Sequence, residues 1–345
     1  MNGDSAKSEG RAVPPTAWTA RQERSNLQVL RLMRWIAMAA GRRASRLLLG
    51  PIALYFVIFG GEARRASRAY LARALGRPAT WRDGYAHVFT FASTVLDRVY
   101  LLQERFDEFR FEASNPEAVM APFARGEGVL AFGAHVGSFE ALRMIGHDKG
   151  LRVAIVMYED NARLINDTLA ALVPKARAGE PPKATLHTIG LGRVDAMLSL
   201  RQWLDDGGLA GLLADRTLPG SSQRSKSVAL NFLGAPALFP DGPFRLAAML
   251  RRKVVFMAGI YRGGRDYDLR FVELADFGEP RTMTGAERDA AIRAALERYV
   301  ATLEALCREA PYNWFNFYDF WADADASSAA AAAPASATKP PHDAP

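Results

Sequence analysis

The chain has 345 residues, of which 49% are hydrophobic and 23% charged, and its net charge is +7 at neutral pH. This composition can bury a sizeable core, in one large domain or two small ones. The single cysteine, Cys307, excludes a disulfide framework within the chain, and its helical surroundings favour a small core residue over a nucleophile. Five histidines without cysteine or HExxH spacing argue against a zinc site.

The N-terminal quarter carries the positive charge. Residues 1–30 are polar, lack the apolar region of a secretory signal peptide and are interpreted as a disordered tail. Residues 1–82 hold 15 Lys and Arg against 4 Asp and Glu. Because the whole chain has a net charge of only +7, the remaining residues are net negative.

Residues 31–82 are interpreted as a basic, apolar, membrane-associating helical segment. Its most apolar run, 47–59, has a helical length of about 20 Å, which is shorter than the roughly 30 Å core of a bilayer. Arginines flank this run on both sides, at Arg42, Arg43, Arg46, Arg64, Arg65 and Arg68. This pattern suits a segment in the interface of an anionic membrane, with Trp35 and Tyr55 at the headgroup level. The alternative is a buried core helix beside a solvated basic surface. A nucleic-acid surface is a poorer account, because no nucleic-acid-binding motif accompanies the arginines.

The rest of the chain alternates between short apolar runs and helical patterns. Helices are predicted at 61–75, 85–106, 161–173 and 194–205, and strands at 129–132, 151–158, 184–189, 209–214 and 254–261. The alternation predicts an α/β domain over residues 83–322, with a largely parallel sheet covered by helices. Residues 323–345 are rich in Ala, Pro and Ser and are predicted to be disordered.

The most informative stretch begins with the buried strand at 129–132. A glycine-rich turn containing His135 follows it, and a helix is predicted from near Phe139, with Glu140 in its first turn. We expect Glu140 to reach back to His135, fix its tautomer and stabilise its imidazolium form. No Ser or Cys is placed as a protein nucleophile, so His135 is a candidate general base for a substrate hydroxyl. The alternative is a loop histidine bonded to backbone beside a solvent-facing glutamate.

A second set of polar residues follows the predicted strand at 209–214. In open α/β sheets, sites lie at the carboxyl ends of the strands. Asp215 and Arg216 occupy such a position, so we expect them on the same face of the sheet as His135.

The spacing His135-x4-Glu140 resembles the His-x4-Asp/Glu motif of glycerolipid-type acyltransferases. Two later stretches, 231–245 and the aromatic segment 311–321, narrow the resemblance to the lipid A biosynthesis late acyltransferases, the lauroyl and myristoyl transferases of bacterial inner membranes. The aromatic segment is also expected to seal the end of the sheet. The resemblance covers roughly residues 30–322. Two features depart from the family pattern: Arg163 is offset from the family's arginine, and Asp319 and Asp323 stand where relatives carry basic residues.

The resemblance implies an enzyme that moves a fatty acyl group from an acyl-carrier-protein or CoA thioester to a hydroxyl of a lipid acceptor, lipid A-like or another glycolipid or lysolipid. His135 would be the base, Glu140 its orienting carboxylate, and backbone N–H groups near Ser138 would support the oxyanion. No metal or redox cofactor is implied.

The implied substrate-binding residues are Asp215 and Arg216, on the headgroup side of the site, and Arg224 and Lys226 in the next loop. Arg224 and Lys226 would bind phosphates of the donor or of the lipid, unless their loop is solvated and its charges incidental. The implied location is the cytoplasmic face of the bacterial inner membrane, as a peripheral or monotopic protein on its anionic surface. The alternative function is a non-catalytic peripheral membrane protein that binds lipid and retains the acyltransferase fold.

Overall fold

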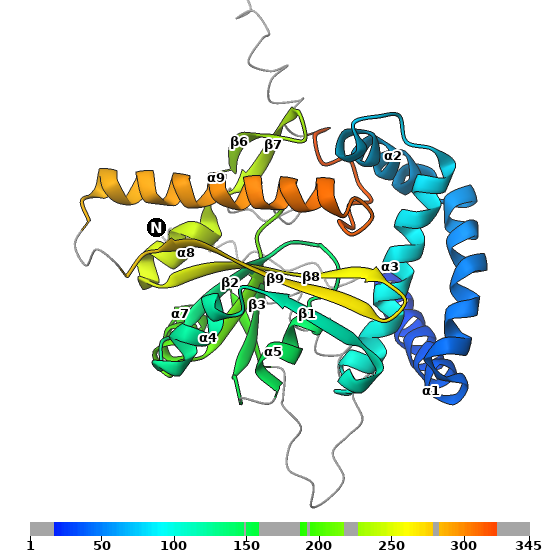
Figure 1. Cartoon of the computed structure of the whole chain (residues 1–345), viewed down its shortest axis with the longest axis horizontal. Helices are drawn as coiled ribbons and strands as arrows, with labels where there is room; N and C mark the ends of the chain where they lie inside the picture. Colours follow the sequence, from blue (N-terminus) through cyan, green and yellow to red (C-terminus); the bar gives the residue numbers. More distant parts are fainter. Residues whose placement is uncertain are drawn as a thin grey trace, which may run out of the picture.

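A computed structural model describes residues 17–147, 150–158, 187–191, 194–216, 227–278 and 283–322. A seven-stranded sheet lies at the centre of the fold, and helices pack on it (Figure 1). The predicted α/β class with a mostly parallel sheet is therefore confirmed. The predicted helix at 161–173, the first part of the predicted strand at 184–189, and Arg163, Arg224, Lys226 and Asp323 lie outside the described residues.

The strand order in the sheet is β1-β9-β8-β2-β5-β3-β4. The strands are β1 (Arg110–Ser114), β2 (Val129–Gly133), β3 (Val153–Tyr158), β4 (His187–Leu191), β5 (Leu209–Leu213), β8 (Lys253–Gly263) and β9 (Asp266–Asp276). Among these strands, β8 and β9 form the antiparallel pair, and the other neighbours run parallel. A separate hairpin consists of β6 (Ser227–Phe232) and β7 (Ala235–Pro240).

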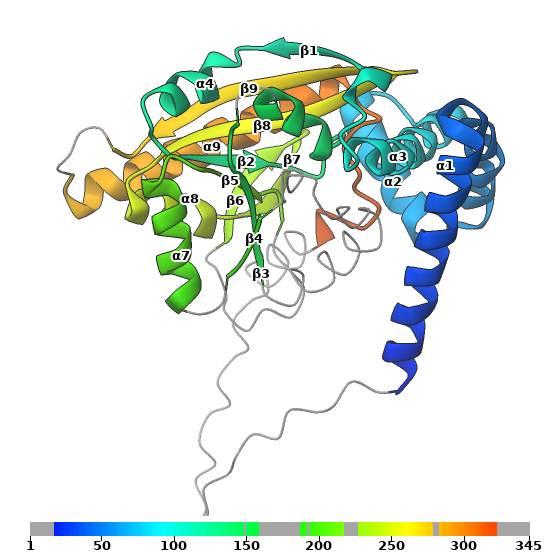
Figure 2. The same cartoon turned by 90° about the horizontal axis from the view of Figure 1, so that it is seen from below.

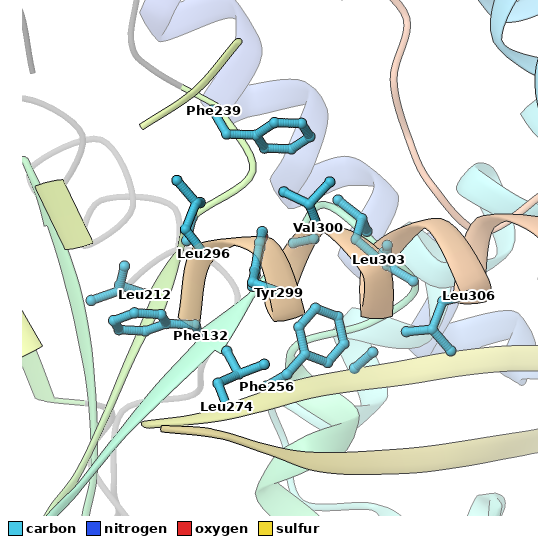
Figure 3. Packing of buried hydrophobic residues seen from close by; sticks show 14 of the residues in the cluster. Phe132, Leu212, Phe239, Phe256, Leu274, Leu296, Tyr299, Val300, Leu303 and Leu306 are labelled. Carbon is cyan, nitrogen blue, oxygen red and sulfur yellow. The ribbon is translucent and has the colours of Figure 1, made fainter. Parts of the chain in front are cut away.

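Helices cover both faces of the sheet. They are α1 (Ala17–Phe59), α2 (Gly61–Leu75), α3 (Trp81–Leu101), α4 (Glu117–Ala124), α5 (Met144–His147), α7 (Val194–Asp205), α8 (Gly242–Leu250) and α9 (Gly285–Glu309), with short 3-10 turns η1 (Phe106–Glu108) and η2 (Glu140–Arg143). Side chains alternate along β2, because successive residues of a strand point to opposite faces. Leu130 and Phe132 belong to the core cluster that includes side chains of α9, where Phe132 is seen beside them (Figure 3), and Val129 and Ala131 belong to the second cluster, which includes side chains of α3 and α4. All five residues of β2 are buried, as expected for a strand covered on both faces.

The N-terminal helices lie together at one end of the sheet (Figure 2). The helix α1 begins at Ala17, inside the segment that the sequence analysis assigned to a tail, and it breaks at Gly41, whose φ is +75°. No described helix is by itself long and apolar enough to cross a bilayer, although the bent pair Ala37–Phe59 and Gly61–Leu75 passes that test by length and composition. Large apolar side chains of α1 are exposed at Trp35, Leu47, Leu48, Ile52, Leu54, Tyr55, Phe56, Ile58 and Phe59.

One arginine of this region has a different environment from the one predicted. Arg42 was expected to face lipid headgroups, but it is only 8% exposed and forms a bidentate ion pair with the fully buried Asp97 of α3, at 2.7 and 2.8 Å. Tyr267 of β9 donates a further hydrogen bond to Asp97. Arg42 therefore attaches α1 to the α/β domain, and Arg43 beside it is exposed.

Candidate functional site

The site forms where two neighbouring parallel strands end. The register of β2 and β5 places Gly133 beside Leu213. Residues the same distance beyond these two partners, His135 and Asp215, therefore leave the sheet side by side. The sequence predicts Asp215 and Arg216 on the face that carries His135, and the structure brings both to the imidazole ring.

Glycine allows the loop after His135 to follow β8 closely. Gly137 has a φ of +60° and bridges to Gly259 of β8. A Cβ atom at Gly137 would collide with the carbonyl of Gly259, and one at Gly259 would collide with the carbonyl of Ser138. The two glycines thus permit a backbone approach that fixes the path of the loop.

His135 and Asp215 form a hydrogen-bonded pair. The Nδ1 atom of His135 lies 2.8 Å from Oδ1 and 3.1 Å from Oδ2 of Asp215, and the backbone N–H of His135 donates to Oδ2 at 3.1 Å. The indole Nε1–H of Trp314 donates to the same Oδ2 at 3.2 Å. Asp215 is 1% exposed and His135 is 33% exposed, so the carboxylate is buried behind a ring that reaches the surface.

The ionisation of Asp215 determines the tautomer of His135. Burial by itself raises the pKa of Asp215, but the charge and hydrogen bonds of His135 and the charge of Arg216 outweigh it and lower the pKa from 3.8 to about 2. At neutral pH the carboxylate is therefore an acceptor only, so Nδ1 of His135 carries the proton that is donated to it. The lone pair is then on Nε2, for which no hydrogen-bond partner exists among the described residues.

Arg216 lies at the edge of the imidazole. Its Nε is 3.0 Å from Nδ1 of His135, and its guanidinium stacks over the ring of Tyr318 at 5.2 Å. The Nε–H of Arg216 points at Nδ1 of His135, which can accept this hydrogen bond only when it carries no proton. When Nδ1–H donates to Asp215, the two N–H groups face each other, and Arg216 acts on the ring as a nearby positive charge.

The expected contact between Glu140 and His135 is wrong. Glu140 begins η2, and its carboxylate pairs with Arg98 of α3 at 2.6 Å and accepts a hydrogen bond from the Ser138 hydroxyl at 3.0 Å. These partners direct the side chain toward α3, and no hydrogen bond or ion pair joins Glu140 to His135 among the described residues. The carboxylate at Nδ1 of His135 belongs to Asp215 instead.

Two of the backbone N–H groups near Ser138 that are expected to support an oxyanion are already bonded. Ser138 N–H donates to the carbonyl of Gly259 at 2.8 Å, and Gly137 N–H donates to that of Asn313 at 2.9 Å. His135 N–H donates to Asp215, as described above. The turn therefore uses these donors to hold its own conformation, and the nearest fixed positive charge at the ring is Arg216.

The aromatic C-terminal segment, which carries part of the resemblance and is expected to seal the end of the sheet, also contacts the His135 loop. Phe315 N–H donates to the carbonyl of His135 at 2.8 Å, and Trp314 forms an antiparallel bridge with Val136. The side chain of Asn313 completes the hydrogen bonds of the Tyr261 backbone, accepting from its N–H and donating to its carbonyl. The amide and indole groups in this aromatic run were the signal for a role beyond packing.

A buried histidine supports this segment from α3. His87 accepts a hydrogen bond from the Ser67 hydroxyl at Nδ1, at 2.7 Å, and donates Nε2–H to the carbonyl of Trp314 at 2.9 Å. Complete burial lowers the pKa of His87 from 6.5 to about 4, so the ring is neutral at physiological pH.

The described part of the chain contains no group of three or more His, Cys, Asp or Glu side chains that could hold a metal ion. It provides a base, a buried carboxylate and a cation at the end of two strands. In comparisons with known proteins, no protein-family model matches the chain and no curated protein matches its sequence.

Proposed function

We propose that this protein is a membrane-associated acyltransferase, with an acyltransferase-like fold, that moves a fatty acyl group from a thioester to a hydroxyl of a lipid. The observation that carries the proposal is the pairing of His135 with Asp215. A buried carboxylate that holds Nδ1–H leaves the Nε2 atom as a base, and this atom belongs to a partly exposed ring. No Ser or Cys side chain among the described residues hydrogen-bonds to Nε2, which favours a base that acts on a substrate hydroxyl.

In the proposed reaction, Nε2 of His135 accepts the proton of the acceptor hydroxyl as the hydroxyl oxygen attacks the thioester carbonyl. The tetrahedral intermediate then collapses, its carbon–sulfur bond breaks, and the ester forms. The imidazolium returns its proton to the departing thiolate, which leaves as the thiol of the acyl carrier protein or of CoA. Asp215 stays ionised throughout and stabilises the imidazolium.

Arg216 is the proposed electrostatic partner of the oxyanion. Its guanidinium lies at the imidazole edge and is held over Tyr318, so its charge is available before the intermediate forms. A preorganised charge of this kind stabilises a developing negative charge without reorganisation. This role replaces the one expected for Ser138 N–H, which donates to Gly259.

The proposed membrane surface is the exposed apolar part of α1 together with exposed arginines of α2. Exposed aromatic and aliphatic side chains from Leu47 to Phe59 would enter the headgroup and acyl boundary, and Arg65 and Arg68 would face anionic lipids. Exposed large apolar side chains gathered on one helix in this way favour an interaction site.

The test of the function is transfer of labelled acyl chains from acyl carrier protein or CoA to a bacterial lipid extract. We expect His135→Ala to lower the rate by about 10²–10⁴-fold, the usual contribution of a general base. His147→Ala is the matched control, because His147 is an exposed histidine of α5 that lies outside the site, and its rate should match wild type. A folded His135→Ala protein with the wild-type rate would refute the mechanism, and the lipid-binding alternative would then be favoured.

A further inference from the structure

A series of hydrogen bonds, joined through the covalent frame of Trp314, links the N-terminal helices to the partner of His135. They run from Ser67 of α2 to His87 of α3, from His87 to the carbonyl of Trp314, and from the Trp314 indole to Asp215. We propose that Trp314 is a positioning residue, whose indole N–H fixes Asp215 so that His135 keeps its proton on Nδ1, and that His87 holds Trp314 in place from α3. The part of this inference that concerns catalysis rests on the proposed function.

Packing and backbone contacts around Trp314 fix the orientation of its indole ring. The residue is 1% exposed, and its backbone is tied to the His135 loop by the bridge to Val136. Its ring makes edge-to-face contacts with Tyr70 at 4.9 Å and Phe320 at 4.9 Å. These contacts aim Nε1–H at Oδ2 of Asp215, so the donor is placed before any substrate arrives.

The indole N–H of Trp314 orients the Asp215 carboxylate so that Oδ1 faces Nδ1 of His135. Oδ1 accepts the shorter bond from Nδ1–H of His135, whereas Oδ2 is occupied by the indole and by the backbone N–H of His135. A neutral histidine free in water prefers the proton on Nε2, so the Nδ1–H tautomer depends on a correctly oriented carboxylate. Without the indole, the carboxylate can rotate away from Nδ1, and a proton on Nε2 removes the lone pair that a base requires.

His87 links α2 and α3 to Trp314, the residue whose indole N–H donates to Asp215. The carbonyl of Trp314 is an acceptor only, so Nε2 of His87 carries the proton and Nδ1 accepts from the Ser67 hydroxyl. The His87 ring also stacks on Phe317 at 4.6 Å. The helices α2 and α3 that hold Trp314 in place therefore also pack against α1, the helix that carries the exposed apolar side chains.

The test compares Trp314→Phe with Trp321→Phe. Both residues are buried tryptophans of the C-terminal segment, but Nε1 of Trp321 has no hydrogen-bond partner among the described residues. The readouts are the ring ¹⁵N chemical shifts of His135, which report its tautomer, and the acyl transfer rate. We expect Trp314→Phe to move His135 from the Nδ1–H toward the Nε2–H tautomer and to lower the rate by up to about 100-fold, and Trp321→Phe to change neither.

The two readouts separate this inference from the proposed function. A changed tautomer in a protein without acyl transfer would support the positioning role and contradict the function. An unchanged tautomer in Trp314→Phe would overturn the positioning role whatever the rate. If Trp314→Phe does not fold, the indole N–H resonance of Trp314 is compared between wild type and Asp215→Asn. A shift of that resonance supports the contact, and its absence refutes the role.

Discussion

At the scale of single residues, His135 is oriented by a carboxylate 80 positions away in the sequence. Glu140 is closer along the chain, but it is bonded to Arg98 and Ser138. The two carboxylates therefore have different partners. Asp215 is bonded to His135, the proposed base, and Glu140 ties the start of η2 to α3.

Asp215→Asn and Glu140→Gln should differ strongly in transfer activity. Each keeps the size of the side chain and removes its charge. We expect Asp215→Asn to lower the transfer rate by about 10²-fold or more, because the imidazolium loses its counterion. Glu140→Gln should lower the transfer rate much less, since Glu140 bonds to Arg98 and Ser138 and not to His135.

The comparison is made from single-turnover rates at saturating donor, with circular dichroism to establish that both variants are folded. Equal losses in the two variants would contradict the assignment of Asp215 as the partner of His135. A larger loss in Glu140→Gln would restore the role that the sequence spacing assigned to Glu140.

At the scale of elements, α1 is attached to the α/β domain by polar as well as apolar contacts. Arg42 pairs with Asp97 and donates to the carbonyl of Gly264, and Arg46 donates to the hydroxyl of Tyr261. These contacts bind α1 to α3 and to the β8–β9 hairpin. They also explain why the arginines before the apolar run do not all face outward.

Arg42→Ala should destabilise the protein far more than Arg43→Ala. Removing Arg42 leaves Asp97 buried without its cation, and breaking a buried pair in this way costs about 3–5 kcal/mol in the free energy of unfolding. Arg43 is exposed, so its substitution should change that free energy by no more than about 0.5 kcal/mol. Urea denaturation measures both values, and equal values would show that the Arg42–Asp97 pair does not hold α1.

At the scale of the whole molecule, apolar and basic side chains gather at one end. The helices α1 and α2 lie at the opposite end of the fold from α7 (Figure 1). Arg64 keeps its charge but is tied to the end of α1, where it donates to the carbonyls of Val57 and Ile58. The other exposed arginines of α2 are Arg65, which pairs with Glu62 at 3.8 Å, and Arg68.

Vesicle flotation should separate the two contributions to membrane binding. Replacing Phe56 and Phe59 with Ser should weaken binding to neutral and anionic vesicles alike, because each buried Phe contributes about 1.5–3 kcal/mol. Replacing Arg65 and Arg68 with Glu should weaken binding to anionic vesicles only, since each basic residue near such a surface contributes about 1 kcal/mol. Leu198→Ser, at an exposed apolar residue of α7, is the control. Undiminished flotation of both double variants would exclude this surface as the membrane contact.

The sequence by itself determined the elements whose pattern is local. The helices α2 and α7 have the predicted bounds, and β2 and β5 follow from short, continuous apolar runs. By contrast, β9 was not predicted, although Asp266–Phe271 alternates charged and apolar residues, which is the period of a half-buried strand. The hairpin β6–β7 was also missed; its strands carry no charged residues, and Pro236 and Pro240 weaken the strand pattern of β7.

Only the tertiary structure decided which groups meet. The sequence placed His135 and Asp215 each at a strand end, but their contact requires that β2 and β5 be neighbours in register. The same holds for the hydrogen bond from the Trp314 indole to Asp215 and for the ion pair of Arg42 with Asp97, which join distant parts of the chain. Spacing along a chain fixes distances within one helix or strand. Distances between elements depend on sheet order and packing, which local patterns do not contain.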